Sequence, residues 1–98
     1  MKLEINYTED ALADLEGFRK YDQTLILDTI DRQLTHQPAV ETRNRKRLRP
    51  NRVSEWELRI GHFRVFYDVR ADDGLVKVIA IGYKERSRLF LRGEEFEL

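Results

Sequence analysis

Two arginines that are predicted to face each other across a β-hairpin are the first candidates for chemistry. In the stretch WELRIGHFRVFY, Gly61-His62 reads as a two-residue turn, which places Arg59 directly opposite Arg64. Because like charges at such a cross-strand pair repel by up to ~1 kcal/mol, an anion must offset them. Glu57, which lies diagonally beside the pair, is an internal candidate. An external phosphate, which guanidinium groups bind well, is the other. The residues alone leave both open.

A second concentration of positive charge precedes this hairpin. The run RNRKRLRPNR at 43–52 carries six cationic side chains, those of Arg43, Arg45, Lys46, Arg47, Arg49 and Arg52. The 98-residue chain is neutral, yet residues 1–42 carry four basic and nine acidic side chains, and residues 43–70 carry nine basic and three acidic ones. A local basic surface of this kind binds a polyanion whatever the net charge of the protein. The alternative is a solvated strand edge whose charges discourage aggregation.

The composition excludes several kinds of site. The chain has no cysteine and only two histidines, His36 and His62, so neither a disulfide nor a zinc site is expected, and no cofactor motif is visible. The N-terminal MKLEINYTED lacks the apolar core of a signal peptide, and no apolar run reaches membrane-spanning length. We therefore expect a soluble cytoplasmic protein without metal or cofactor that does not contact a membrane.

Amphipathic spacing predicts the elements that position these residues. Residues 3–7 alternate like a strand, and two helices follow at about 8–20 and 22–34, capped by Thr8 and Asp22 respectively. Their apolar stripes are Ala11, Leu12, Leu15 and Phe18 in the first helix and Ile26, Leu27, Ile30 and Leu34 in the second. The predicted fold class is α+β, with an N-terminal strand, a helical hairpin and a mainly antiparallel twisted sheet packed on the helices. Its length indicates a single domain spanning 1–98.

Two turns set the register of the three strands that follow the basic run. The turns at Gly61-His62 and at 71–74 (ADDG) give registers that continue without a break, which pairs Arg64 with both Arg59 and Ile81. The face expected to pack on the helices carries Trp56, Leu58, Ile60, Phe63, Val65, Tyr67, Val69, Val76, Val78 and Ala80. The opposite face carries the arginine pair and is expected to be open.

The C-terminal part of the chain extends the positive patch. Lys84, Arg86 and Arg88 follow the third of these strands, and 89–91 (LFL) read as an apolar tail that packs onto the sheet. The last residues, GEEFEL at 93–98, are acidic.

The order of these segments resembles the RelE/ParE superfamily, the toxins of type II toxin–antitoxin systems. The most specific parts are L-R-I-x-x-x-R-V-x-Y at 58–67 and I-G-x-K-x-R-S at 81–87, and the resemblance covers about 5–91. It implies a cognate antitoxin as the protein partner, in a toxin–antitoxin hetero-oligomer. It also implies one of two targets, because RelE-like toxins cut ribosome-bound messenger RNA whereas ParE-like toxins poison DNA gyrase.

The RelE chemistry that the resemblance implies uses the ribose 2′-hydroxyl to attack the adjacent phosphate. Carried over by position, Arg64 matches a third-strand arginine, Lys84 replaces an arginine after the last strand, and Arg86 matches a neighbouring basic position. Glu57 falls where a lysine is expected and becomes the candidate base, and Phe90 replaces a tyrosine. The predicted catalytic residues are therefore Glu57, Arg59, Arg64, Lys84 and Arg86, and the six cations at 43–52 are predicted to bind RNA or the antitoxin.

Two functions follow from the resemblance. The first is a ribosome-dependent messenger RNA endonuclease that inhibits translation and is neutralised by its antitoxin. The alternative is a ParE-like gyrase-inhibiting toxin or a catalytically weakened, non-enzymatic binding member, which the departures at Glu57, Lys84 and Phe90 favour. The sequence therefore leaves open whether the protein is an enzyme.

Overall fold

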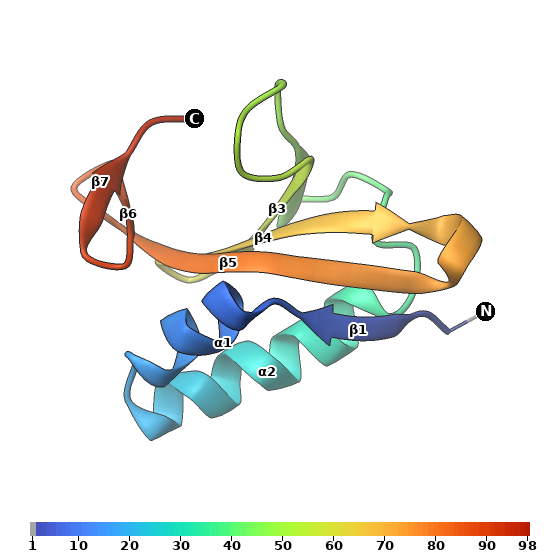
Figure 1. The fold of residues 1–98 in the computed structure, drawn as a ribbon, viewed down its shortest axis with the longest axis horizontal. Helices are drawn as coiled ribbons and strands as arrows, with labels where there is room; N and C mark the ends of the chain where they lie inside the picture. The colour runs from blue at the N-terminus through green and yellow to red at the C-terminus, as the bar shows by residue number, and fades with distance from the viewer. Residues whose placement is uncertain (1) are drawn as a thin grey trace.

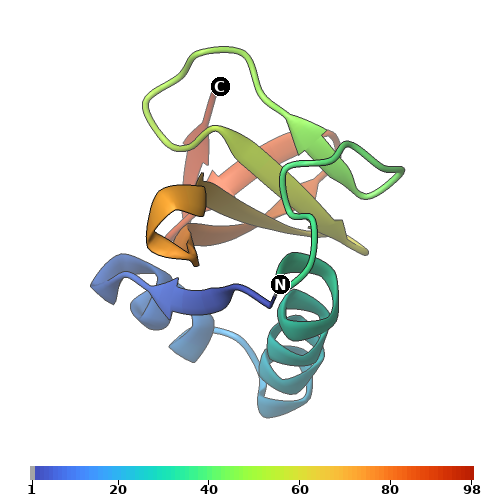
Figure 2. The ribbon, with the colours of Figure 1, turned by 90° about the vertical axis from the view of Figure 1, so that its right-hand side faces the viewer.

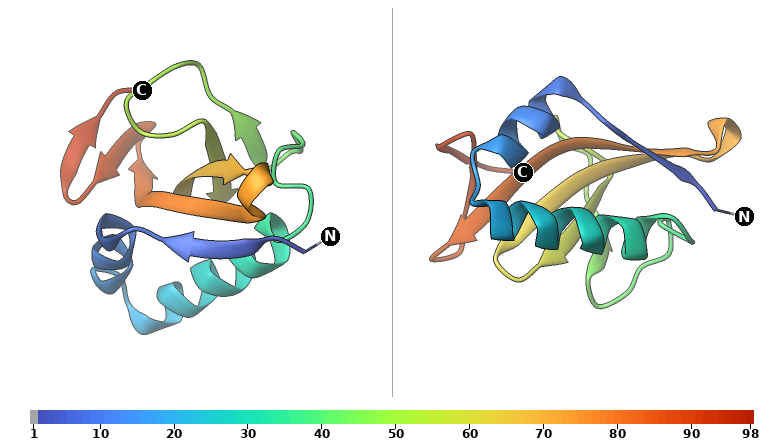
Figure 3. Two further views of the ribbon diagram at one scale, coloured as in Figure 1. Left: turned by 45° about the vertical axis from the view of Figure 1, so that its right-hand side comes forward. Right: turned by 90° about the horizontal axis from the view of Figure 1, so that it is seen from below.

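The computed structural model describes residues 2–98, which form a curved sheet with two helices against one face (Figure 1). The elements, in chain order, are β1 (Glu4–Tyr7), α1 (Glu9–Glu16), α2 (Lys20–Leu34), β2 (Arg45–Arg47), β3 (Trp56–Ile60), β4 (Phe63–Arg70), a 3₁₀ turn (Ala71–Asp73), β5 (Leu75–Glu85), β6 (Arg88–Leu91) and β7 (Glu94–Phe96). The loop after β2 and the β6–β7 hairpin rise on the side away from the helices (Figures 2 and 3). None of the helices within 2–98 has the length and apolar character needed to cross a membrane.

The strands make one mixed sheet. Neighbours follow the order β2-β3-β4-β5-β6-β7 and are antiparallel throughout, while β1 adds to β5 in parallel. The predicted α+β class is thus confirmed, although the segment at 89–91 is a strand of the sheet rather than a tail lying on it.

Helix α1 begins where the sequence predicted, and α2 does not. Thr8 caps α1, because its hydroxyl oxygen accepts a hydrogen bond from the Ala11 amide at 3.0 Å. Asp22 was predicted to cap the second helix, which is wrong: α2 begins at Lys20, and the capping position is Arg19, whose side chain makes no capping bond. Asp22 lies in the first turn instead, where its carboxylate suits the positive end of the helix dipole and accepts from Arg19 Nε at 3.2 Å.

The buried face of α1 includes a carboxylate. Leu12 was predicted to be part of the apolar stripe, but it is 46% exposed, whereas Asp14 is buried. The helix is rotated so that Ala11, Asp14 and Leu15 face the sheet. A buried carboxylate is costly unless it is hydrogen-bonded, so Asp14 must have partners in the sheet.

Those partners lie at a β-bulge in β5. The first predicted hairpin is confirmed, from Ile60 opposite Phe63 to Trp56 opposite Tyr67. The second is confirmed only near its turn. The register shifts by one residue at Ile79, so the predicted continuous pairing is wrong beyond that point.

The bulge exists because α1 satisfies the backbone groups that it leaves unpaired. The Thr8 hydroxyl donates to the Ile79 carbonyl at 2.8 Å, and the Ile81 amide donates to Asp14 Oδ2 at 2.9 Å. Asp14 also accepts from Arg92 at 2.9 Å, which ties the β6–β7 turn to the same point. Buried backbone groups need such partners, and here side chains of α1 replace the ladder bonds.

Because of the bulge, the residues of β5 beyond Ile79 lie on the opposite face of the sheet from the one predicted. Each face of the sheet carries an apolar cluster. Ile81, not the predicted Ala80, joins the core under the helices, which also holds Ile26, Ile30, Leu34, Leu58, Val65, Tyr67, Val76 and Val78. Ala80 lies on the opposite face in a second cluster with Phe66, Leu89 and Leu91, against which Leu48, Val53, Ile79 and Phe96 pack. The face expected to be open is therefore partly covered by the loop after β2 and by the C-terminal hairpin.

Candidate functional site

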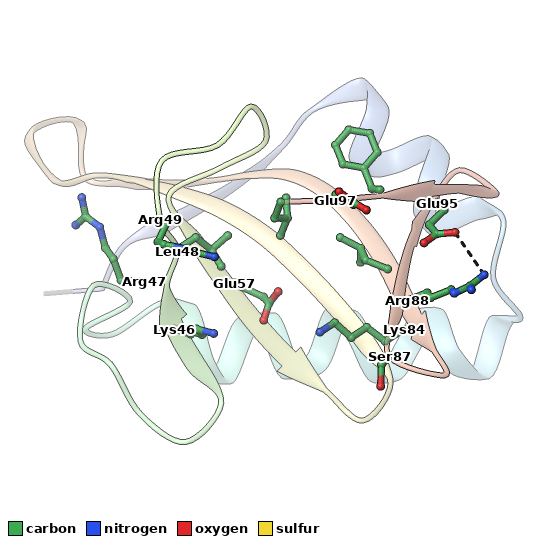
Figure 4. Close-up of a pocket in the computed structure, with 13 residues that line it drawn as sticks. Lys46, Arg47, Leu48, Arg49, Glu57, Lys84, Ser87, Arg88, Glu95 and Glu97 are labelled. Carbon is green, nitrogen blue, oxygen red and sulfur yellow. Dashed lines mark ion pairs between the residues drawn. The ribbon is translucent and has the colours of Figure 1, made fainter.

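A groove crosses the face of the sheet away from the helices (Figure 4). Its volume is about 500 Å³, and it lies between β2 with the residues that follow it and the β6–β7 hairpin. The lining residues are Lys46, Arg47, Leu48, Arg49, Glu57, Lys84, Ser87, Arg88, Leu89, Glu95, Phe96, Glu97 and Leu98. Cationic side chains from distant parts of the chain thus surround a partly apolar floor.

Glu57 occupies the middle of this groove, between two lysines. It stands on β3 opposite Lys46 of β2, and the side chains of Lys46 and Lys84 point toward it from the two walls (Figure 4). Its side chain is 15% exposed, so its carboxylate is held in a partly desolvated site among cations. A carboxylate flanked by ammonium groups can take a proton while the cations stabilise negative charge on a phosphate.

Arg64 is a turn-stabilising residue at the base of this arrangement and does not line the groove. It is 8% exposed, and its guanidinium donates to the carbonyls of Gly61 at 2.8 Å and Phe63 at 2.9 Å. Burial lowers the pKa of Arg64, and Arg59 lowers it further, while the carboxylate of Glu57 opposes both.

Glu57 is also the internal anion that the sequence offered to offset the repulsion between Arg59 and Arg64. Its carboxylate lies 3.9 Å from Arg64 Nε, so an internal anion is present beside the guanidinium of Arg64. Beyond the bulge, Gly82 stands opposite Arg64 where Ile81 was predicted. A Cβ at Gly82 would lie 2.3 Å from the Phe90 carbonyl oxygen, so this row has no room for a side chain. The guanidinium of Arg64 is therefore enclosed by neighbouring groups, while Arg59 remains exposed.

The other two predicted catalytic residues lie outside the groove. Arg59 and Arg86 are exposed and neither lines it. Arg86 and Ser87 form the turn between β5 and β6. Their φ values of +53° and +69° belong to the left-handed region, which residues other than glycine rarely adopt. Of the five predicted catalytic residues, the groove brings together Glu57 and Lys84.

The basic run at 43–52 divides between the groove and the scaffold. Lys46, Arg47 and Arg49 line the groove. Arg45 is buried, and its guanidinium donates to the carbonyl oxygens of Gln33 at 2.7 Å and Val40 at 3.1 Å, which fastens β2 to the end of α2. These bonds turn the Arg45 guanidinium into the fold, away from the groove that Lys46, Arg47 and Arg49 line.

The two remaining cations of the run lie at its ends. Arg43 is exposed in the loop before β2 and does not line the groove. Arg52 lies over the ring of Phe96, with 5.9 Å between its guanidinium carbon and the ring centroid. This contact connects the loop to the C-terminal hairpin across the groove.

One side chain builds the loop that carries Arg49 and Arg52. The Asn51 amide nitrogen donates to the carbonyls of Arg49 at 2.7 Å and Ser54 at 2.9 Å, and its oxygen accepts from the amides of Val53 at 2.7 Å and Ser54 at 3.1 Å. Such side-chain bonds replace backbone pairing in a loop, so Asn51 fixes the position of this groove wall.

The side chains of Phe90, Tyr83 and His62 do not line the groove. Phe90 stacks on Tyr83 with ring centroids 5.4 Å apart, and Tyr83 packs against the core under the helices. His62 lies against Phe63 at the turn. Within residues 2–98, no group of three or more histidine, cysteine or acidic side chains is placed to hold a metal ion.

The C-terminal segment contributes residues that the sequence did not predict for the site. Glu95, Phe96 and Glu97 line the groove, together with Arg88, which was predicted only to extend the positive patch. The sequence does contain a pattern that predicts this hairpin. Leu89 and Leu91 are spaced as on one face of a strand, and Arg92-Gly93 forms a two-residue turn with φ values of +51° and +79°. That pattern indicates a hairpin that returns EEFEL toward the sheet.

Comparisons with known proteins agree with this architecture. A chain of the RelBE2 toxin–antitoxin complex from Mycobacterium tuberculosis superposes with a TM-score of 0.75 at 18% identity, covering 86% of this chain and 93% of that one. The archaeal RelE–RelB complex from Pyrococcus horikoshii OT3 gives a TM-score of 0.70 at 19% identity, covering 88% of this chain and 99% of that one. The search of the curated proteins gave no match.

A family model identifies the chain from its sequence. The model described as "ParE toxin of type II toxin-antitoxin system, parDE" matches residues 5–88, which include both helices and the sheet through β5. At the identities above, the structural matches show the fold, and the family match covers most of the chain. The protein therefore belongs to the family of ParE toxins of type II toxin–antitoxin systems, within the RelE/ParE superfamily.

Proposed function

We propose that this toxin is an endoribonuclease that cuts ribosome-bound messenger RNA and so inhibits translation in the cytoplasm. The observation that carries the proposal is the carboxylate of Glu57 between Lys46 and Lys84 in a groove lined by cations. A polyanionic strand would bind in this groove through its phosphates, and the Glu57 carboxylate would act on it as a base.

The chemistry assigned to the groove is an internal transfer of the phosphoryl group. Glu57 removes the proton of a ribose 2′-hydroxyl, and the 2′ oxygen attacks the adjacent phosphorus. The bond to the 5′ oxygen of the next nucleotide breaks, which leaves a 2′,3′-cyclic phosphate. Lys46 stabilises the charge on the phosphoryl oxygens, and Lys84, on the opposite wall, protonates the departing 5′ oxygen.

The partner proposed for this toxin is a cognate antitoxin. Both structural neighbours were determined as complexes of a toxin with its antitoxin. A groove that combines cations with the apolar side chains of Leu48, Leu89 and Phe96 suits an acidic, amphipathic segment. An antitoxin segment in the groove would exclude RNA, which is the simplest form of neutralisation.

The test is cleavage of messenger RNA in a purified translation system, mapped by primer extension. Glu57→Gln is expected to lower the cleavage rate by roughly 10²- to 10⁴-fold, since it removes the base. Glu85→Gln is the matched control, because Glu85 is exposed at the end of β5 and does not line the groove. Lys84→Met, compared with Lys77→Met on the same strand, tests the proton donor in the same way.

Two results would refute the proposal. One is wild-type protein that leaves translated messenger RNA intact. The other is a Glu57→Gln variant that cuts as fast as the Glu85→Gln control.

A second candidate function is inhibition of DNA gyrase. It is favoured by the family match, whose description is that of ParE toxins, and by the engagement of Arg64 in the Gly61 turn. A supercoiling assay separates the two: inhibition of gyrase by a protein that leaves translation unaffected would select this function over RNA cleavage.

A further inference from the structure

The acidic end of the chain lies in the cationic groove. Glu95 and Glu97 line it, together with Phe96 and Leu98. Glu95 forms an ion pair with Arg88, with 3.7 Å between the carboxylate oxygen and the guanidinium nitrogen. Figure 4 shows both glutamates on the C-terminal segment that crosses above the sheet.

Three contacts hold this segment in place. Phe96 packs against the second apolar cluster, whose members include Leu89 and Leu91. Arg52 lies over the Phe96 ring from the opposite wall. At the turn of the hairpin, Arg92 donates to the buried carboxylate of Asp14, whose side chain is 1% exposed. The carboxylates are therefore presented to the groove by an anchored strand.

The segment changes the charge balance of the groove. Five cationic side chains line it, those of Lys46, Arg47, Arg49, Lys84 and Arg88, and three carboxylates, those of Glu57, Glu95 and Glu97. Two of the three carboxylates come from this segment. Any phosphate entering the groove must compete with them for the same cations.

We propose that Glu95 and Glu97 are a built-in competitor of RNA, which occupies cations of the groove and weakens the binding of RNA phosphates. The inference rests on the proposed function, since it takes RNA as the ligand of the groove. It accounts for an acidic strand folded against a basic surface, and it makes the C-terminal hairpin a regulator of affinity.

The experiment measures binding of a fluorescein-labelled single-stranded RNA oligonucleotide to the full chain by anisotropy at low and high salt. Glu95→Gln/Glu97→Gln is expected to bind about threefold to tenfold more tightly than wild type at low salt, with the gain shrinking as salt rises. Glu94→Gln is the matched control, because Glu94 is on the same strand but does not line the groove. Both substitutions keep Phe96, and thermal melting of each variant verifies that the hairpin is folded.

The outcomes separate the two proposals. If the double variant gains no more affinity than Glu94→Gln, while Lys46→Met/Lys84→Met weakens RNA binding, the competitor is refuted and the groove still binds RNA. If Lys46→Met/Lys84→Met binds as wild type does, or no protein binds the oligonucleotide, both proposals fail. A gain restricted to the double variant supports the competitor.

Discussion

The two faces of the central strands are covered in different ways. Toward the helices, alternate residues of β3, β4 and β5 join α1 and α2 in a continuous apolar core in which Tyr67, Leu58 and Ile30 are fully buried. On the other face, a smaller apolar cluster lies under the loop after β2 and the C-terminal hairpin, beside a charged groove. The helix-covered face gives the fold its stability, and the groove face combines local stability with charges that a ligand can use.

The strongest test of this comparison pairs two buried leucines, one on each face. Leu58→Ala should destabilise the fold by about 2–5 kcal/mol, because it opens a cavity in the core under the helices. Leu91→Ala should cost about 2 kcal/mol or less, since the smaller cluster around it can collapse more readily. Urea unfolding followed by circular dichroism measures both. Equal losses would contradict the difference assigned to the two faces.

The next largest effect should come from the carboxylate that joins the two regions. Asp14→Ala leaves the Ile81 amide and Arg92 without their partner, so it should destabilise the protein by about 1–3 kcal/mol. Asp10→Ala is the control, because Asp10 is exposed in the first turn of α1 and affects only the helix dipole. Hydrogen exchange should show faster exchange of the Ile81 amide in the Asp14 variant, and unchanged exchange there would contradict the role assigned to it.

A smaller loss of stability is expected when only the loop that forms the groove wall loses its hydrogen bonds. Asn51→Ala removes four hydrogen bonds within the loop after β2 and should cost about 1–2 kcal/mol. Because Arg49 and Arg52 would lose their fixed positions, RNA affinity should fall in the anisotropy assay even though no cation is removed. A stability loss with unchanged affinity would show that the loop does not contribute to binding.

The smallest expected effect is a gain in stability rather than a loss. Arg86 and Ser87 hold positive φ values in a two-residue turn, for which Asn-Gly is the preferred sequence. Replacing both, as Arg86→Asn/Ser87→Gly, should raise the free energy of unfolding by about 0.5–1 kcal/mol. RNA binding should change little, because Arg86 does not line the groove. A marked loss of cleavage would restore Arg86 to the site that the family resemblance implied.

The sequence predicted what local patterns determine. The Gly61-His62 turn sets the register of β3 and β4 over a few residues, so the opposition of Arg59 and Arg64 was foreseen correctly. The bulge at Ile79 was missed, because its polar groups are satisfied by Thr8 and Asp14, which are 71 and 67 residues away from their partners along the chain. A pattern within one strand contains no information about such distant bonds.

The candidate site was foreseen in the same partial way. Glu57, Lys84 and three cations of the basic run were named and do line the groove. The burial of Arg45 and Arg64 was not foreseen, because each is fixed by carbonyl groups that the folded chain brings to it. Glu95 and Glu97 were missed because the docking of the C-terminal hairpin depends on tertiary contacts of Phe96 and Arg92.

The bulge at Ile79 has an evolutionary consequence. The side chains of β5 after the bulge point to the opposite face from the one that they would have in a regular strand. Lys84 therefore lines the groove, and Tyr83 packs under the helices. Deletion of one residue between the bulge and Tyr83 would exchange the two side chains and replace a cationic groove wall with a phenol, whereas deletion of the extra residue Ile79 itself would leave both in place. A single-codon insertion or deletion is thus a short route between relatives of the same fold that differ in chemistry.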